Sequence, residues 1–424
     1  MNKYRTNPAV IQQQDRKISL FVAFYFIAFT CNMAIKNIFP IPLSMWGVLS
    51  ALWGMGILIF MLMGLPEVSK RSSKLLFKTY ILFIVLFMLS VSMATFRGEP
   101  TNAILRDDAF VTLAWWIPLG VYSCSVYDKR ILYDTLYKGS FVIATVLLLY
   151  FYFGKIVVIN EDENDYSMTF GIAFIMPILL HLNELFKKRR NWLLALASVE
   201  IITVVIFANR TVLLSLIFFL AYKWTVGNKS PSRRILVIFA TCAGIILYTL
   251  FFESFLFSTN SFLDSYNLQS RTLTMMANDN INDDSGRGEI WAICANMILE
   301  RPLFGWGIGG EFYTISKEFN GITTNVSGAS STHNGILQAL VNFGIIGGII
   351  VVIIYIIPLI RINRIKDSST HDLILITGSV GLIPCLISAS GLFIKPELAI
   401  YIFLYYNYMK KNSNKPGLSL YATA

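Results

Sequence analysis

One histidine stands out by its neighbours. His333 lies in the stretch SSTHNGIL, between hydroxyl residues and a long apolar run, and His181 and His371 are the other two histidines of the chain. Ser331 or Thr332 can cap a helix that begins here, because a side-chain oxygen accepts a hydrogen bond from a free backbone N–H. The positive end of a helix disfavours imidazolium, so we expect His333 to be neutral near pH 7 and able to accept a proton.

Two arginines occupy similar positions, each at the start of an expected helix. Arg210 interrupts an otherwise nearly continuous apolar run in FANRTVLLSL, and Asn209 can cap the helix that follows. Arg287 opens the helix expected in GRGEIWAICANMILERPLFGWGIGG. Helix N-termini bind anions, and a guanidinium group binds phosphate through two parallel N–H donors. If these arginines meet His333, they form a phosphate or diphosphate site beside a neutral base.

Each candidate residue also has a structural interpretation. His333 can be a helix cap or an interface residue. An arginine on the outer side of a membrane can bind a lipid phosphate or a carboxylate of the protein itself. Glu200, in the middle of an apolar segment, can line a substrate cavity or serve as a buried partner within the helix bundle. The acidic stretch 161–165 can bind a cation or form a solvated loop. The functional interpretation therefore depends on the three basic residues lying together.

The composition indicates what kind of fold must position them. Of the 424 residues, 55% are hydrophobic and 14% are charged, which is far too apolar for a soluble domain. Apolar stretches that can cross a bilayer as helices predict an all-α polytopic membrane protein with about 12 transmembrane helices. The expected spans are 18–35, 42–65, 75–96, 109–126, 139–154, 169–185, 192–208, 211–225, 235–253, 333–360, 373–389 and 392–409.

The distribution of Lys and Arg predicts the orientation. The net charge is +10, but the basic residues are not gathered in one patch, so we expect no nucleic-acid partner. They lie mainly in alternate connections, a positive-inside pattern that predicts cytoplasmic N- and C-termini. The first apolar segment shows no small-residue cleavage site, which favours a retained anchor. The five cysteines show no disulfide framework and no metal-ligand spacing.

The expected spans divide the chain into three parts. Residues 1–253 hold spans one to nine, 254–332 form a long outer loop, and 333–424 hold spans ten to twelve and a cytoplasmic tail. A loop this long is usually functional or disordered, and this one contains an amphipathic helix that Pro302 should end. The apolar positions at helical spacing are Ile290, Trp291, Ile293, Met297 and Ile298.

These motifs resemble the O-antigen ligase and polymerase superfamily of bacterial envelope glycosyltransferases. The resemblance covers roughly residues 164–350 and is clearest in NRTVLL, in GRGEIW…ERPLFGWGIGG and in THNGILQALVNFGIIGG, with a weaker match at NDYSM. It implies a GT-C-like enzyme that needs no metal and no cofactor. Such an enzyme transfers a glycan from an undecaprenyl diphosphate carrier on the outer face of the bacterial cytoplasmic membrane.

The resemblance also implies roles for individual residues. Arg210 and Arg287 match family arginines that hold the diphosphate, and His333 matches the histidine that orients or deprotonates the attacking sugar hydroxyl. Asn334 and Trp291 match further family positions, for which we expect supporting roles. We also include Glu200 as a supporting candidate, with its structural alternative left open.

Three functions remain open at this stage. We favour a polymerase of lipid-linked repeat units, because such enzymes serve both capsule and O-antigen systems. A ligase would transfer the glycan to lipid A core, and a lipid-linked oligosaccharide flippase is the alternative from another class. Transporters place ionisable groups near the bilayer midplane, whereas here the basic residues lie at the outer end. Expected partners are the lipid-linked donor, a glycan acceptor, membrane lipids, and the flippase and chain-length regulator of the pathway.

Overall fold

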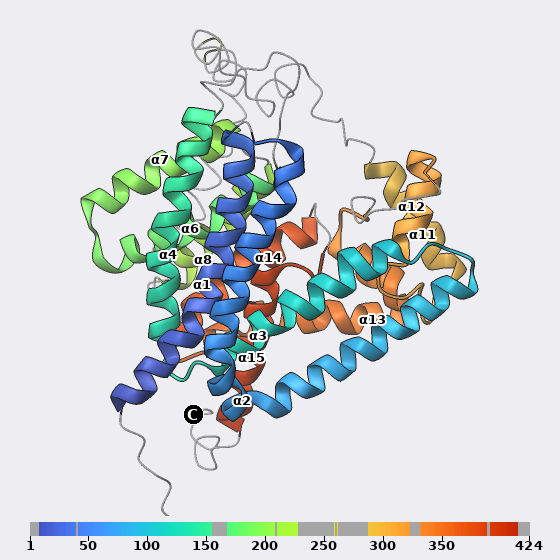
Figure 1. Cartoon of the computed structure of the whole chain (residues 1–424), viewed down its shortest axis with the longest axis horizontal. Coiled ribbons are helices and arrows are strands. Elements are labelled where there is room, and N and C mark those ends of the chain that lie inside the picture. The colour runs from blue at the N-terminus through green and yellow to red at the C-terminus, as the bar shows by residue number, and fades with distance from the viewer. Residues whose placement is uncertain are drawn as a thin grey trace, which may run out of the picture. The chain divides into compact units, whose positions relative to one another are not determined.

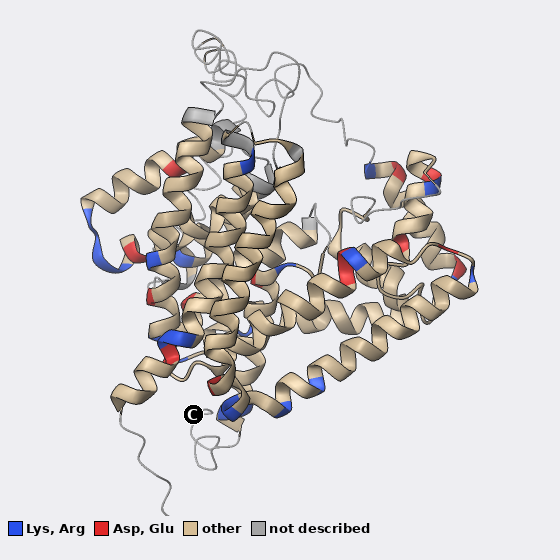
Figure 2. Ribbon diagram, viewed as in Figure 1, with Lys and Arg blue, Asp and Glu red and all other residues tan. Residues whose placement is uncertain are grey.

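The computed structural model is helical in the part of the chain that it describes (Figure 1). It describes residues 8–39, 41–154, 168–207, 210–227, 258, 261, 287–322, 331–387 and 391–413, and these include no strand. Five helices among them are long and apolar enough to cross a membrane. Two shorter apolar helices lie at Asn191–Val204 and Val212–Thr225. Figure 2 shows long helical stretches without charged residues, as an apolar solvent requires.

The expected spans fall on helices, except for 235–253, which lies outside the described residues. The count of about 12 transmembrane helices stays a prediction.

The chain forms two compact units: unit 1 is Met1–Phe24, Ile57–Leu136 and Gly286–Ala424, and unit 2 is Tyr25–Gly56 and Tyr137–Ser285. The elements outside the site are α1 Pro8–Ile38, α2 Leu43–Phe96, η1 Ile104–Ala109, η2 Thr112–Trp116, α3 Ile117–Ser125, α4 Lys129–Leu149, η3 Tyr150–Gly154, η5 Ile362–Arg364, α14 Ser368–Ile387 and α15 Pro396–Ser413.

The second and third expected spans share one kinked helix. Spans 42–65 and 75–96 are the two arms of α2, and the helical dihedral angles fail between them at Ser72, where φ is −142° and ψ is 19°. Each arm has more than the roughly 20 residues that cross a bilayer. The sequence did not show that the two spans meet at a kink with no loop between them.

A buried ion pair in unit 1 fixes this kink. Arg71, the residue before Ser72, pairs with Asp15 of α1, and both side chains are buried. Arg71 also donates to the carbonyl oxygen of Ser125 at 3.1 Å. The Asp15 carboxylate accepts the backbone N–H groups of Tyr127, at 3.1 Å, and Asp128, at 2.8 Å. One carboxylate therefore ties together α1, the α2 kink and the turn before α4.

We predict that Asp15→Ala lowers the stability of the folded protein by about 3 to 5 kcal/mol, because it leaves the Arg71 guanidinium buried without its counter-ion. Thermal unfolding of the purified protein in detergent measures the loss. Glu67→Gln is the matched control, since the Lys70–Glu67 pair spans 3.8 Å at an exposed lysine and should contribute less than about 1 kcal/mol. Equal losses in the two variants would contradict this account.

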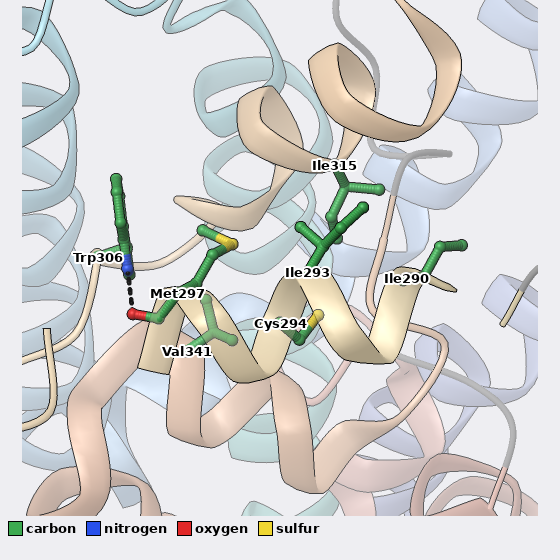
Figure 3. Packing of buried hydrophobic residues seen from close by; sticks show 7 residues of the cluster. All are labelled: Ile290, Ile293, Cys294, Met297, Trp306, Ile315 and Val341. Atoms are coloured by element: carbon green, nitrogen blue, oxygen red, sulfur yellow. Dashed lines mark hydrogen bonds between the residues drawn. The ribbon is translucent and has the colours of Figure 1, made fainter. Parts of the chain in front are cut away.

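Helices α11 Arg287–Glu300, α12 Glu311–Asn320 and α13 Gly335–Ile360 pack together in unit 1. The expected amphipathic helix is α11, and it ends just before Arg301 and Pro302 as predicted. Ile298 is partly buried, whereas Trp291 is partly exposed. Figure 3 shows the cluster that joins the three helices: Ile290, Ile293, Cys294, Met297, Trp306, Ile315 and Val341. The sequence analysis did not predict α12.

The glycine-rich segment between α11 and α12 is pinned to α13. The backbone N–H of Trp306 donates to the carbonyl oxygen of Val341 at 2.8 Å, and that of Gly307 donates to Asn342 at 3.0 Å. These carbonyl groups are free because α13 is interrupted at Gly344, where φ is 67°. A Cβ atom on Gly305 would lie 2.4 Å from the Val341 oxygen, so only glycine allows this approach. Backbone contacts to α13 therefore hold this glycine-rich segment in place.

Candidate functional site

His333 lies just before α13, and its backbone has a conformation that residues other than glycine rarely adopt. Its φ is 49°, in the left-handed region, which costs a residue with a Cβ atom about 1 kcal/mol or more. Strain of this kind is retained where the surroundings hold a side chain in a required direction. Among the described residues, only Arg189 shares a positive φ without being glycine.

The expected N-cap at Ser331 or Thr332 is wrong, because Asn334 caps α13. The side-chain oxygen of Asn334 accepts the backbone N–H groups of Ile336, at 2.9 Å, and Leu337, at 3.1 Å. Asparagine is among the strongest cap residues, and the Thr332 hydroxyl instead donates to the carbonyl oxygen of Asn334. The helix thus starts two residues after His333. Asn334, expected to support substrate binding, has a structural role here.

Arg287 lies close enough to His333 to act on its charge. Burial lowers the pKa of His333, and the positive charge of Arg287 lowers it further, because a second cation is disfavoured there. The direction agrees with the expected neutral imidazole, but the cause differs. The helix end was expected to be responsible, whereas burial and a neighbouring guanidinium lower this pKa. The structure therefore brings two of the three predicted basic residues together in unit 1.

Trp291 links α11 to the segment that carries His333. Its indole N–H donates to the carbonyl oxygen of Thr332 at 3.2 Å. Trp291 lies one turn after Arg287 on α11, and Thr332 directly precedes His333. One hydrogen bond thus fixes the helix start that carries the guanidinium relative to the imidazole. This gives Trp291 a positioning function that its sequence spacing alone did not indicate.

Arg210 is the first residue of α8, Arg210–Gly227, in unit 2, as expected for a residue that opens a helix. Asn209, its expected cap, lies outside the described residues, and so does the acidic stretch 161–165. Among the described residues, no group of three or more His, Cys, Asp or Glu side chains is arranged to hold a metal ion.

Glu200 has a partner inside unit 2. It lies on α7, Asn191–Phe207, and its fully buried carboxylate is 2.8 Å from Nδ1 of His181 on α6, Met168–Lys188. The other ring nitrogen of His181 is 2.9 Å from the Ser140 hydroxyl oxygen. All three side chains are buried. Of the two interpretations, the structure favours the buried bundle partner over a residue that lines a substrate cavity.

A buried polar network that joins α12 to α13 was not predicted. Glu311, the first residue of α12, accepts from the Gln338 amide at 3.1 Å. With its nitrogen turned toward Glu311, the Asn342 amide donates to the other carboxylate oxygen at 2.6 Å. The Gln338 oxygen in turn accepts the backbone N–H of Gly391 at 2.7 Å. Two polar residues four positions apart in the apolar run GILQALVNFG were the sequence signal for this network.

Burial raises the pKa of Glu311 to about 7, while its hydrogen bonds act in the opposite direction. The folded protein therefore holds this proton more tightly than the unfolded chain, whose ordinary value is 4.5. The resulting stabilisation is complete below pH 4.5 and is lost as the pH rises to about 7. By the usual conversion of about 1.4 kcal/mol per pKa unit, the loss is on the order of 3 kcal/mol.

We predict that Glu311→Gln flattens this pH dependence, because an amide does not ionise. Thermal unfolding in detergent at about pH 5 and about pH 8 should show a smaller fall in Tm for the variant than for the wild type. Glu318→Gln, an exposed position on the same helix, serves as the control and should follow the wild type. Parallel pH profiles for Glu311→Gln and the wild type would refute the assignment.

Comparison with known proteins finds one family whose model matches part of the chain. Residues 193–352 match the O-antigen ligase family, a segment that begins within α7 and ends within α13. This match confirms the predicted resemblance to the O-antigen ligase and polymerase superfamily, and it contains Arg210, Arg287 and His333. A search of curated proteins found no match. Together, the matched segment and the apolar helices point to a multi-pass membrane protein, and the match supports a ligase- or polymerase-type function.

Proposed function

We propose that the protein is a membrane glycosyltransferase that polymerises oligosaccharide repeat units linked to undecaprenyl diphosphate. The product is an O-antigen, capsular polysaccharide or exopolysaccharide. In this proposal the reaction takes place on the outer face of the bacterial cytoplasmic membrane, and both termini are cytoplasmic. His333 orients or deprotonates the acceptor hydroxyl, and Arg210 and Arg287 hold the diphosphate. The substrates are a lipid-linked donor and a glycan acceptor.

The observation that carries the proposal is the pairing of Arg287 with a neutral His333. An uncharged imidazole can accept a proton, and a guanidinium at a helix start binds phosphate oxygens. Both groups lie within the segment that matches the O-antigen ligase family. A purely structural residue at position 333 would need neither the strained backbone nor the charge beside it.

The proposed step balances without a further reactant. The acceptor hydroxyl oxygen forms a bond to the anomeric carbon of the donor glycan while the bond from that carbon to the diphosphate oxygen breaks. The hydroxyl proton passes to the free ring nitrogen of His333. The undecaprenyl diphosphate leaves with added negative charge, which the guanidinium groups stabilise. The extended glycan stays on the carrier that supplied the acceptor.

The charge of Arg287 couples donor binding to the pKa of His333. Without donor, the charge of Arg287 disfavours a proton on His333. A bound diphosphate offsets that charge, so the pKa of His333 rises when the donor binds. The imidazole then becomes a better proton acceptor when the reacting bond is in place. This coupling needs Arg287 and His333 to be neighbours.

Two alternatives differ in what becomes of the donor. A ligase needs a second acceptor such as lipid A core, and a flippase moves the lipid-linked glycan across the bilayer unchanged. The family match is compatible with either type of transferase, whereas it gives a flippase no support. Glu200, the residue that most suggested a transport site, is buried against His181.

Reconstitution in liposomes with a lipid-linked repeat unit as the sole substrate tests the proposal. We expect a ladder of longer products. His333→Ala should lower the rate by about 100- to 10,000-fold, the usual contribution of a general base, while the protein still inserts and folds. His371→Ala is the matched control and should keep full activity. No reaction until lipid A core is added would mean a ligase, and translocation of unchanged donor would mean a flippase.

Arg210→Lys and Arg287→Lys should also be impaired in this assay, because a lysine does not offer the paired N–H donors of a guanidinium. Arg106→Lys is the control, since Arg106 is exposed and paired with Asp107.

Wild-type product from the His333→Ala variant would remove the catalytic assignment of His333.

We predict a shifted pH–rate profile for Arg287→Gln. Because Arg287 holds the pKa of His333 down, its loss lets that pKa rise toward the ordinary value of 6.5. The acidic limb of kcat/KM, which reports the free enzyme, should then move to higher pH. An unchanged limb with a higher KM would mean that Arg287 binds substrate without acting on His333.

A further inference from the structure

A second cationic cluster lies at the far end of α11 from Arg287. The indole ring of Trp306 is flanked by two guanidinium groups, with Cζ of Arg97 4.9 Å and Cζ of Arg301 4.4 Å from the ring centroid. The Trp306 N–H donates to the carbonyl oxygen of Met297 at 2.8 Å, which fixes the ring (Figure 3). Arg97 directly follows α2, and Arg301 directly follows α11.

The positive charge of this cluster is only partly balanced. Glu99 accepts from Nε of Arg97 at 2.7 Å and pairs with its Nη2. Nη1 of Arg97 is buried with no hydrogen-bond partner. In the described part of the chain, Arg301 forms no ion pair. Glu99 thus balances the charge of Arg97 alone, Arg97 keeps an unused N–H donor, and the charge of Arg301 makes the cluster complementary to an added anion.

Large apolar side chains project beside both arginines. Phe96 precedes Arg97 and is 94% exposed, and Phe304 follows Arg301 and is 83% exposed. Leu299 and Leu303 of the same segment are exposed as well. We call Phe96, Leu299, Leu303 and Phe304 the apolar tip. Exposed apolar groups of this size beside cations are typical of a membrane interface.

The apolar tip lies alongside a membrane-crossing helix. The backbone N–H of Ile345 donates to the carbonyl oxygen of Pro302 at 2.7 Å, and Gly344 packs against the backbone of Leu303. Gly344 is about 15 Å along α13 from its start, at the usual helical rise. From there α13 exposes an unbroken apolar face that includes Ile346 and Ile350. The tip is therefore continuous with the exposed apolar surface of α13.

We propose that this surface docks an anionic phospholipid of the adjacent leaflet. Its phosphate lies at Arg97 and Arg301, and its acyl chains lie against the apolar tip. The segment between α11 and α12 then dips into the bilayer instead of lying in water. Since α11 is about 20 Å long, this site is distinct from the Arg287 end. It anchors one end of the helix whose other end carries Arg287.

Spin labelling tests whether the tip enters the bilayer. Phe304→Cys is labelled with a nitroxide in nanodiscs that contain phosphatidylglycerol and phosphatidylcholine. We expect the label to be relaxed by oxygen and protected from a soluble nickel chelate, like a label at Ile353→Cys on the exposed face of α13. A label at Glu318→Cys on α12 is the aqueous control. The parent protein measures background labelling from the five native cysteines, of which Cys31, Cys124, Cys294 and Cys385 are buried.

Native mass spectrometry of the same preparations tests the headgroup. We expect phosphatidylglycerol to be retained in preference to phosphatidylcholine, and Arg301→Gln to reduce this retention several-fold. Arg106→Gln, which removes an exposed arginine, should leave it unchanged. A Phe304 label as accessible to nickel as the Glu318 label, or equal retention by Arg301→Gln, would overturn the proposal. Displacement of the bound lipid by an added polyprenyl diphosphate would also overturn it, because the site would then be a donor site.

Discussion

The account depends on one electrostatic constraint, a guanidinium held beside an imidazole that is partly removed from water. Two cations are disfavoured in such surroundings, so the group that can lose its charge does so, and that group is His333. The same guanidinium then stays available for an anionic leaving group. One contact thus supplies both a proton acceptor and an anion-binding group. The diphosphate of a donor would complete the balance of charge.

The fold holds this contact through several weak bonds and not through one strong one. Trp291 joins α11 to the residue before His333, and Asn334 satisfies the first N–H groups of α13. Deeper in unit 1, Glu311 and Gln338 tie α12 to α13. Helix packing in a bilayer gains little from the hydrophobic effect, so buried hydrogen bonds of this kind have a large share in fixing the arrangement. They also explain why polar residues occur within strongly apolar segments.

Hydrophobic periodicity predicted the helical fold and the buried face of α11 well, because both depend on local spacing. It did not predict that α2 continues through Ser72, since that depends on Arg71 meeting Asp15 far along the chain. For the site, the residue types and their order predicted that Arg287 and His333 lie together, and the charge of Arg287 does lower the pKa of His333. The cap at Asn334 was missed because several adjacent residues had suitable side chains, and only the backbone direction distinguishes them.

The central claim is that His333 is uncharged near neutral pH because it is partly buried beside Arg287. A titration of isotope-labelled histidine side chains by NMR measures this directly, with the His333 signals assigned by their loss in the His333→Ala variant. The account predicts a pKa below the ordinary 6.5 for His333, with an increase when inorganic diphosphate is added. A pKa at or above 6.5 without any added anion would contradict it.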